Sequence, residues 1–313
     1  MLHLLNHSVY QDTSMFGGDP EGCLAEERCD GLEVLTSFEP QGLDYRPLAK
    51  GVHLPYASDW MSAWRGDPYP VTEGFEKYYT YGKGPQDVVD TVTDAIRCAS
   101  LLGPSYGVLH LCNVPLGEIL CREFSVTDAE VVATFCEMIN TVVSGMQGCE
   151  PPFRLAFENL WWPGLMMVDD SQVRYLERHL EFDNWSICLD TGHLMSCIPD
   201  IRTEQDGIDA VLRIADSYSS DTLDRITNMH FHWSASWDYR STFVPRQRGD
   251  MDYDTFIREA HRHVSNIDRH NNFTDVRCNE IVEAVSPDVL VHEMTGPEDA
   301  ILGKLRAQRS LMA

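Results

Sequence analysis

The chain has 313 residues, of which 43% are hydrophobic and 23% are charged, which is enough apolar material for a large core. Lysine and arginine number 24 against 49 acidic residues, so the formal net charge is −25 and nucleic acid is disfavoured as a partner. The sequence has no run of 18 apolar residues, and its start lacks the basic and apolar regions of a signal peptide. We therefore expect a soluble cytoplasmic protein with no membrane partner.

Short apolar runs with strand character alternate along the chain with segments of helical spacing. The predicted strands are Leu2–Asn6, Gly31–Thr36, Gly51–Leu54, Gly107–Cys112, Arg154–Leu160, Trp185–Asp190, Ile226–His232 and Val289–Met294. The predicted helices are Pro85–Gly103, Asp128–Val143, Ser171–His179, Gly207–Ala215, Tyr253–His263 and Pro297–Leu311. The helix at Asp128 has the strongest signal, because Thr127 and Glu130 have the spacing of a capping box.

This order of elements predicts an α/β protein built as a single (β/α)8 TIM barrel that spans residues 1–313 as one domain. Strand, helix and strand repeated to eight strands imply parallel pairing, and at this length a closed barrel fits better than an open sheet. Two long connections, 57–83 and 233–250, follow the third and seventh predicted strands. In a barrel they would lie at the catalytic rim as binding walls or lids.

Ionisable side chains stand at the carboxyl ends of the predicted strands. They are His53, His110, Glu158, Asp190 with His193 three residues later, His230, His232 and Glu293. On a barrel these ends converge on one face, where buried carboxylates would repel one another unless a cation neutralised them. Mixed imidazole and carboxylate ligands favour Mn²⁺, Zn²⁺, Fe²⁺ or Co²⁺ over Ca²⁺, with Mn²⁺ and Zn²⁺ preferred.

These motifs resemble the xylose-isomerase-like TIM barrel superfamily, which includes sugar isomerases and epimerases, inosose dehydratases and apurinic-site endonucleases. The resemblance rests on Glu-Asn after strand five, Asp-x-x-His after strand six, His-x-His on strand seven and a strand-eight Glu. Further matches are Asp30-Gly31-Leu32-Glu33 and His53-Leu54-Pro55-Tyr56, so the likeness covers almost the whole chain.

The resemblance implies a four-ligand metal site of Glu158, Asp190, His232 and Glu293, with Glu158 and Glu293 also carrying protons during catalysis. The two strand-seven imidazoles point to the same side of the strand, so we favour His232 as nearer the rim and keep His230 as the alternate. His193 matches a substrate-binding histidine. His53 and His110 match ligands of an additional metal in the endonuclease branch, and otherwise contact substrate.

The sequence also departs from both branches. Trp233 to Asp238 stand where ketose epimerases usually have Gly-Glu and Arg, and Trp161 and Trp162 follow Asn159. For the endonuclease branch, we find no Asp-x-His to complete its three-metal cluster; Asp238-Tyr239-Arg240 is the nearest approach. We therefore expect one metal, with a second open.

The leading interpretation is a metal-dependent isomerase or epimerase of a small sugar, polyol or keto acid that works by carboxylate-mediated proton transfer. The main alternative is a one- or two-metal hydrolase of a small phosphodiester or related substrate. A dehydratase or other lyase at the same site and a non-catalytic binding barrel are further alternatives. Trp161 and Arg240 are predicted to contact the small-molecule substrate. The sequence also leaves open whether the protein forms a homodimer.

Overall fold

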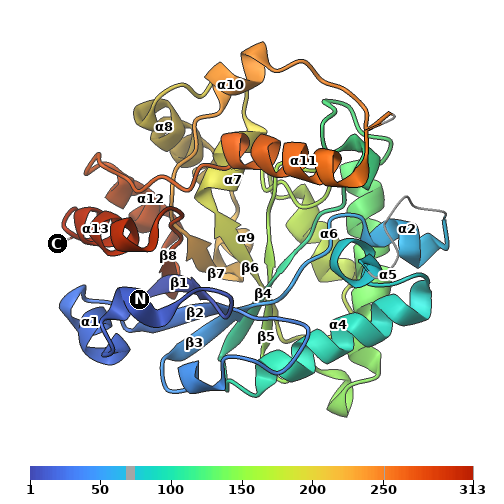
Figure 1. The fold of residues 1–313 in the computed structure, drawn as a ribbon, viewed down its shortest axis with the longest axis horizontal. Helices are drawn as coiled ribbons and strands as arrows, with labels where there is room; N and C mark the ends of the chain where they lie inside the picture. Colours follow the sequence, from blue (N-terminus) through green and yellow to red (C-terminus); the bar gives the residue numbers. More distant parts are fainter. Residues whose placement is uncertain (68–74, 250, 313) are drawn as a thin grey trace.

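Eight parallel strands close into a barrel in which each strand pairs with its neighbours in sequence order, and β1 pairs with β8 (Figure 1). The computed structural model describes residues 1–67, 75–249 and 251–312. The strands are β1 (Leu2–Ser8), β2 (Gly31–Leu35), β3 (Ala49–His53), β4 (Tyr106–His110), β5 (Arg154–Glu158), β6 (Trp185–Asp190), β7 (Ile226–His230) and β8 (Val289–His292). The predicted TIM barrel is therefore confirmed.

Helices surround the barrel and connect its strands (Figure 1). The α-helices are α1 (Pro20–Glu26), α2 (Trp60–Arg65), α3 (Glu76–Thr80), α4 (Pro85–Ser100), α5 (Asp128–Ser144), α6 (Ser171–His179), α7 (Thr191–Cys197), α8 (Glu204–Ala215), α9 (Ser220–Arg225), α10 (Trp237–Thr242), α11 (Tyr253–Ile267), α12 (Cys278–Val285) and α13 (Glu298–Arg309). Short 3-10 turns are η1 (Thr13–Phe16), η2 (Leu43–Tyr45), η3 (Leu116–Glu118) and η4 (Gln147–Cys149).

The predicted helices coincide with α4, α5, α6, α8, α11 and α13, and the Thr127–Glu130 capping box is present. The helices that periodicity did not predict include α1, α2, α3, α7, α9 and α10. Each of these has five to seven residues. Such segments complete too few turns for a hydrophobic stripe to stand out.

Four strands end two residues before their predicted ends, at His110, Glu158, His230 and His292. Beyond β5 and β8 the backbone bonds to partners outside the barrel ladder. The amide of Leu160 bonds to the carbonyl of Leu165, and the amide of Met294 bonds to the side chain of Asn6. His232 and Glu293 therefore lie just past their strands, on the connections at the rim.

Two apolar layers support this arrangement. The barrel interior is filled by buried side chains from β1, β4, β5, β6 and β8, among them the ring of Tyr106. A Cβ on Gly51 would come within 2.1 Å of that ring, so glycine at this position leaves space for it. Outside the barrel, Phe135 of α5 packs edge-on against Phe157 of β5, with ring centroids 5.1 Å apart.

The two connections predicted to form the rim follow β3 and β7. The first includes α2 and α3, and its residues 68–74 lie outside the described part of the chain. The second includes α10. Within the described residues, every helix is too short or too polar to cross a bilayer.

Candidate functional site

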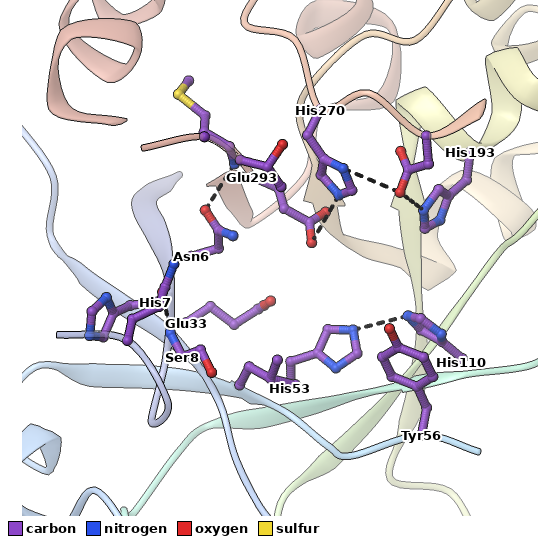
Figure 2. Close-up of a pocket in the computed structure, with 16 residues that line it drawn as sticks. Asn6, His7, Ser8, Glu33, His53, Tyr56, His110, His193, His270 and Glu293 are labelled. Atoms are coloured by element: carbon purple, nitrogen blue, oxygen red, sulfur yellow. Dashed lines mark hydrogen bonds and ion pairs between the residues drawn. The ribbon is translucent and has the colours of Figure 1, made fainter. Parts of the chain in front are cut away.

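A cavity of about 400 Å³ opens at the carboxyl ends of the strands (Figure 2). Five strands end on a predicted site residue: β3 on His53, β4 on His110, β5 on Glu158, β6 on Asp190 and β7 on His230. His53, His110, His193 and Glu293 line the cavity, while Glu158, Asp190, His230 and His232 are almost completely buried beneath it. The structure thus brings the predicted strand-end residues together at one site.

The first cluster of ligand atoms contains His53, His110 and Glu158. The Nε2 atoms of both imidazoles lie 3.1 Å from Oε2 of Glu158 and 3.1 Å from each other. Nδ1 of His53 lies 2.9 Å from the carbonyl oxygen of Leu54, to which it can donate. That bond fixes the tautomer of His53 and turns the lone pair on Nε2 toward the cluster.

The second cluster contains Glu158, Asp190, His230 and Glu293. Nδ1 of His230 lies 3.2 Å from Oε1 of Glu158, 3.1 Å from Oε2 of Glu293 and 3.7 Å from Oδ2 of Asp190. Its other nitrogen, Nε2, lies 2.9 Å from Oε1 of Glu33. The structure therefore groups the alternate, His230, with the three carboxylates, in the place for which the sequence favoured His232.

The third cluster contains His193, His232, Asp268 and His270. Oδ2 of Asp268 lies 3.2 Å from Nε2 of His193 and 3.2 Å from Nδ1 of His270 (Figure 2). Nδ1 of His193 lies 2.9 Å from the carbonyl oxygen of Asn159, so its Nε2 lone pair is free to face Asp268. The ring of His232 stacks on that of His270 at 4.2 Å.

Asp268 and His270 correct the expectation that the chain lacks an Asp-x-His motif. Asp268-Arg269-His270 directly follows α11, in the connection to α12. Asp238, in the motif nearest to it by sequence position, instead lies in the first turn of α10. Asp268 lies 38 residues beyond His230, because α10 and α11 intervene. The Asp-x-His spacing is itself the signal in the sequence that identifies this motif.

A helix cap produces the Asp-x-x-His spacing at the end of β6. Asp190 is the N-cap residue of α7, and its Oδ1 accepts a hydrogen bond from the amide of His193 at 2.6 Å. Its Oδ2 lies 2.9 Å from Nε2 of His232. A Cβ at Gly192 would come within 2.0 Å of the His232 ring, so only glycine leaves this ring in place.

The carboxylates at the site remain ionised. Burial would raise the pKa of Glu158, but His230 and His110 beside it hold that pKa well below its ordinary value. Burial likewise opposes ionisation of Asp190, yet His193 and His232 lower its pKa to about 2. Burial also opposes ionisation of Asp268 and Glu293, but His270 beside Asp268, and His230 with His270 beside Glu293, hold both pKa values below their ordinary range. Four carboxylates thus share this site in their charged form.

The donor set fits divalent transition metals. Several imidazoles have one nitrogen committed to a fixed partner and the other directed at a carboxylate, as metal-binding histidines do. The two Nε2 atoms of His53 and His110 face each other at 3.1 Å, which requires a proton or a cation between them. Imidazole with carboxylate is the ligand chemistry of Zn²⁺, Mn²⁺, Fe²⁺ and Co²⁺.

The two remaining predicted substrate contacts differ in their distance from these clusters. The ring of Trp161 is 5.0 Å from that of His193, so Trp161 packs beside the third cluster. Arg240 does not occur among the described residues that line the cavity, and its guanidinium donates to the carbonyl of Ser196 at 2.6 Å. It lies in a neighbouring depression with Arg122. The structure therefore does not bring Arg240 to the ligand clusters.

Comparison by sequence finds no match, either among protein-family models or among curated proteins. Solved structures are similar in fold. A D-tagatose 3-epimerase-like protein superposes with a TM-score of 0.55 at 15% identity, covering 100% of this chain and 97% of its own. Endonuclease IV from Thermus thermophilus superposes with a TM-score of 0.56 at 15% identity, covering 100% of this chain and 99% of its own. A 3-keto-D-glucoside 4-epimerase from E. coli superposes with a TM-score of 0.51 at 11% identity, covering 100% of this chain and 97% of its own. The chain thus has the fold of the xylose-isomerase-like TIM barrels, as its motifs predicted.

Proposed function

We propose that this protein is a metal-dependent hydrolase of phosphate diesters with a centre for three divalent cations. The observation that carries the proposal is the position of Glu158 between two clusters. Its Oε2 faces His53 and His110, and its Oε1 faces His230, so one carboxylate serves both clusters. The third cluster adjoins them through Asp190 and His193.

Divalent cations held in this way supply Lewis-acid activation of water and neutralise the charge that develops on a phosphoryl group. The reaction adds one water to the diester, breaks one P–O bond and yields a phosphate monoester and an alcohol. The chain's own residues orient the ligands. Glu33, Leu54 and Asn159 fix the imidazole rings of His230, His53 and His193. The cavity above the clusters is large enough for a small substrate.

Two measurements on purified protein test the proposal. Elemental analysis without added metal should find about three transition-metal ions per chain, and the protein should cleave bis(p-nitrophenyl) phosphate. Glu158→Gln should reduce both the metal content and the rate, because it weakens two clusters at once. A fully metal-loaded protein that cleaves no phosphate diester would contradict the proposal.

An isomerase or epimerase is the second candidate, since Glu158, Asp190, His230 and Glu293 together suffice for a one-metal site. In that reaction Glu158 and Glu293 would move a proton at the carbon next to a substrate carbonyl. A panel of ketoses, inososes and hydroxypyruvate-like acids in deuterated water separates the candidates. Incorporation of deuterium into one of them, lost in Glu293→Gln, would favour the epimerase.

A further inference from the structure

The two sides of the cavity differ in chemistry (Figure 2). One side presents the ligand clusters through His53, His110, His193 and Glu293. The other side presents the neutral polar residues Asn6 and Ser8 of β1, Gln11 after β1 and Thr295 after β8. His7 and the carboxylate of Glu33 also lie on this side. A bound substrate would therefore place its reacting group over the clusters and the rest of the molecule against neutral hydrogen-bonding groups.

The charge on the cavity limits what it can bind. The described residues that line it include no lysine or arginine, and its imidazoles belong mostly to the ligand clusters, so bound cations would be the main positive charge facing a negative substrate. Three divalent cations would exceed the four ligating carboxylates by two positive charges, or by one when the buried Glu33 is included. The excess of one positive charge, with Glu33 counted, matches the single negative charge of one phosphate diester. Further phosphates would meet a chain whose formal charge is −25.

Asn6 is the neutral residue whose direction is best defined. Its Oδ1 accepts a hydrogen bond from the amide of Met294 at 2.9 Å, which fixes the orientation of the side-chain amide. The NH2 group is consequently turned away from Met294, toward the open space beside Glu293 (Figure 2). Gln11 is held in the same way, because its Oε1 accepts from the amide of Ser8 at 2.8 Å. Amide NH2 groups donate to hydroxyl, ether and carbonyl oxygens.

From these features we infer that the substrate is a small diester with a single phosphate and a neutral, hydroxylated alcohol group that accepts a hydrogen bond from Asn6. The inference rests on the proposed hydrolase function and specifies its substrate class. Such a diester differs from a polynucleotide in carrying one negative charge. It differs from a phosphorylated sugar in having its phosphate esterified to two groups.

Three probes test the substrate class with metal-loaded protein: glycerophosphoglycerol, a thymidine decanucleotide and bis(p-nitrophenyl) phosphate. We expect glycerophosphoglycerol to have a kcat/KM at least about tenfold above that of the decanucleotide, per cleavable bond. Equilibrium binding of the decanucleotide, measured by fluorescence anisotropy, should be weak. A decanucleotide that binds in the submicromolar range with a steep salt dependence, and is cleaved faster, would overturn the inference.

The outcomes also separate this inference from the proposed function. If bis(p-nitrophenyl) phosphate is cleaved and the decanucleotide is the better substrate, the substrate class is wrong while the hydrolase stands. If none of the three diesters is cleaved by protein with a full metal complement, the hydrolase proposal itself fails and the inference fails with it.

Asn6→Asp tests the residue. Aspartate keeps an acceptor for the amide of Met294 but removes the NH2 donor and adds a negative charge. The lost donor should raise the KM for glycerophosphoglycerol by up to about tenfold more than the KM for bis(p-nitrophenyl) phosphate, which has no hydroxyl group. The added charge alone would raise both values equally, which would overturn the role of Asn6.

Calorimetric binding of inorganic phosphate to metal-loaded protein provides a readout that does not depend on turnover. Wild type and Asn6→Asp should each bind one phosphate per chain, with weaker binding in the variant. The matched control is Asn140→Asp on the outer face of the barrel, where Asn140 bonds to Glu181 and His179. It makes the same change in charge and should leave both KM values unchanged. Stoichiometric binding of two or more phosphates would overturn the single-phosphate inference.

Discussion

The buried carboxylate of Glu33 on β2 lies 2.9 Å from Nε2 of His230 on β7, across the barrel interior. Its other oxygen accepts a hydrogen bond from the hydroxyl of Tyr106 at 2.7 Å. This contact leaves Nδ1 of His230 as the nitrogen that faces Glu158, Asp190 and Glu293. Glu33 is therefore a positioning residue for the second cluster.

Glu33→Gln should weaken metal binding at the second cluster by about 10- to 100-fold, since the amide lacks the charge that orients His230. Competition with a chromophoric chelator measures the affinity. Tyr106→Phe is the matched control, because it removes one hydrogen bond to Glu33 and keeps the contact between Glu33 and His230. An affinity that falls equally in both variants would mean that general repacking, and not Glu33 itself, controls the cluster.

Asp268→Asn should lower the metal content from about three to about two ions per chain, because Asp268 contacts both His193 and His270. The first two clusters do not include Asp268 and should stay loaded. Asp238→Asn provides the comparison, as Asp238 belongs to the motif that the sequence alone placed nearest to Asp-x-His. Elemental analysis should find its metal content equal to that of wild type; a loss there would contradict the assignment.

Gly192→Ala should destabilise the fold by about 1–3 kcal/mol, because the new Cβ overlaps the ring of His232. Urea unfolding of the metal-free protein measures this cost. A comparison is Gly117→Ala, a position where a Cβ meets no atom within 4 Å. If Gly192→Ala is as stable as Gly117→Ala, the close packing of Gly192 against His232 is not a constraint.

Stability should fall in mild acid because of His263 on α11. Burial, with the positive charges of Arg240 and Arg246, lowers the pKa of His263 from 6.5 to about 4. At a pH between these two pKa values His263 is protonated in the unfolded chain but neutral in the folded chain. The free energy of unfolding therefore decreases as the pH drops from 6.5 toward 4. The ring packs 4.1 Å from that of Phe243, so Phe can replace it.

His263→Phe should therefore show a smaller loss of stability over this pH range than wild type. Unfolding of metal-free protein by urea at about pH 6.5, 5.5 and 4.5 gives the comparison. His261→Phe on the exposed side of the same helix controls for removing a histidine. The prediction is wrong if the two variants lose stability in parallel with wild type.

The sequence by itself determined the barrel and most of the residues that meet at its rim. Alternating apolar runs and helical stripes, such as the one that begins at the Thr127 cap, specify local structure through nearest-neighbour interactions along the chain. The closure of eight parallel strands then follows from their number and connections. His53, His110, Glu158 and Asp190 could be predicted as neighbours because each ends a strand, and strand ends meet on one face.

Only the tertiary structure decided how these residues divide into clusters. His230 and His232 point to the same side of one strand, so periodicity cannot distinguish them. In the structure His230 lies 3.2 Å from Glu158 and 3.1 Å from Glu293, whereas His232 lies 2.9 Å from Asp190. Asp268 and His270 lie on a connection outside any strand, and the packing of α11 brings them beside His193. Such contacts depend on how elements distant in sequence pack together, which the local pattern of a single chain does not encode.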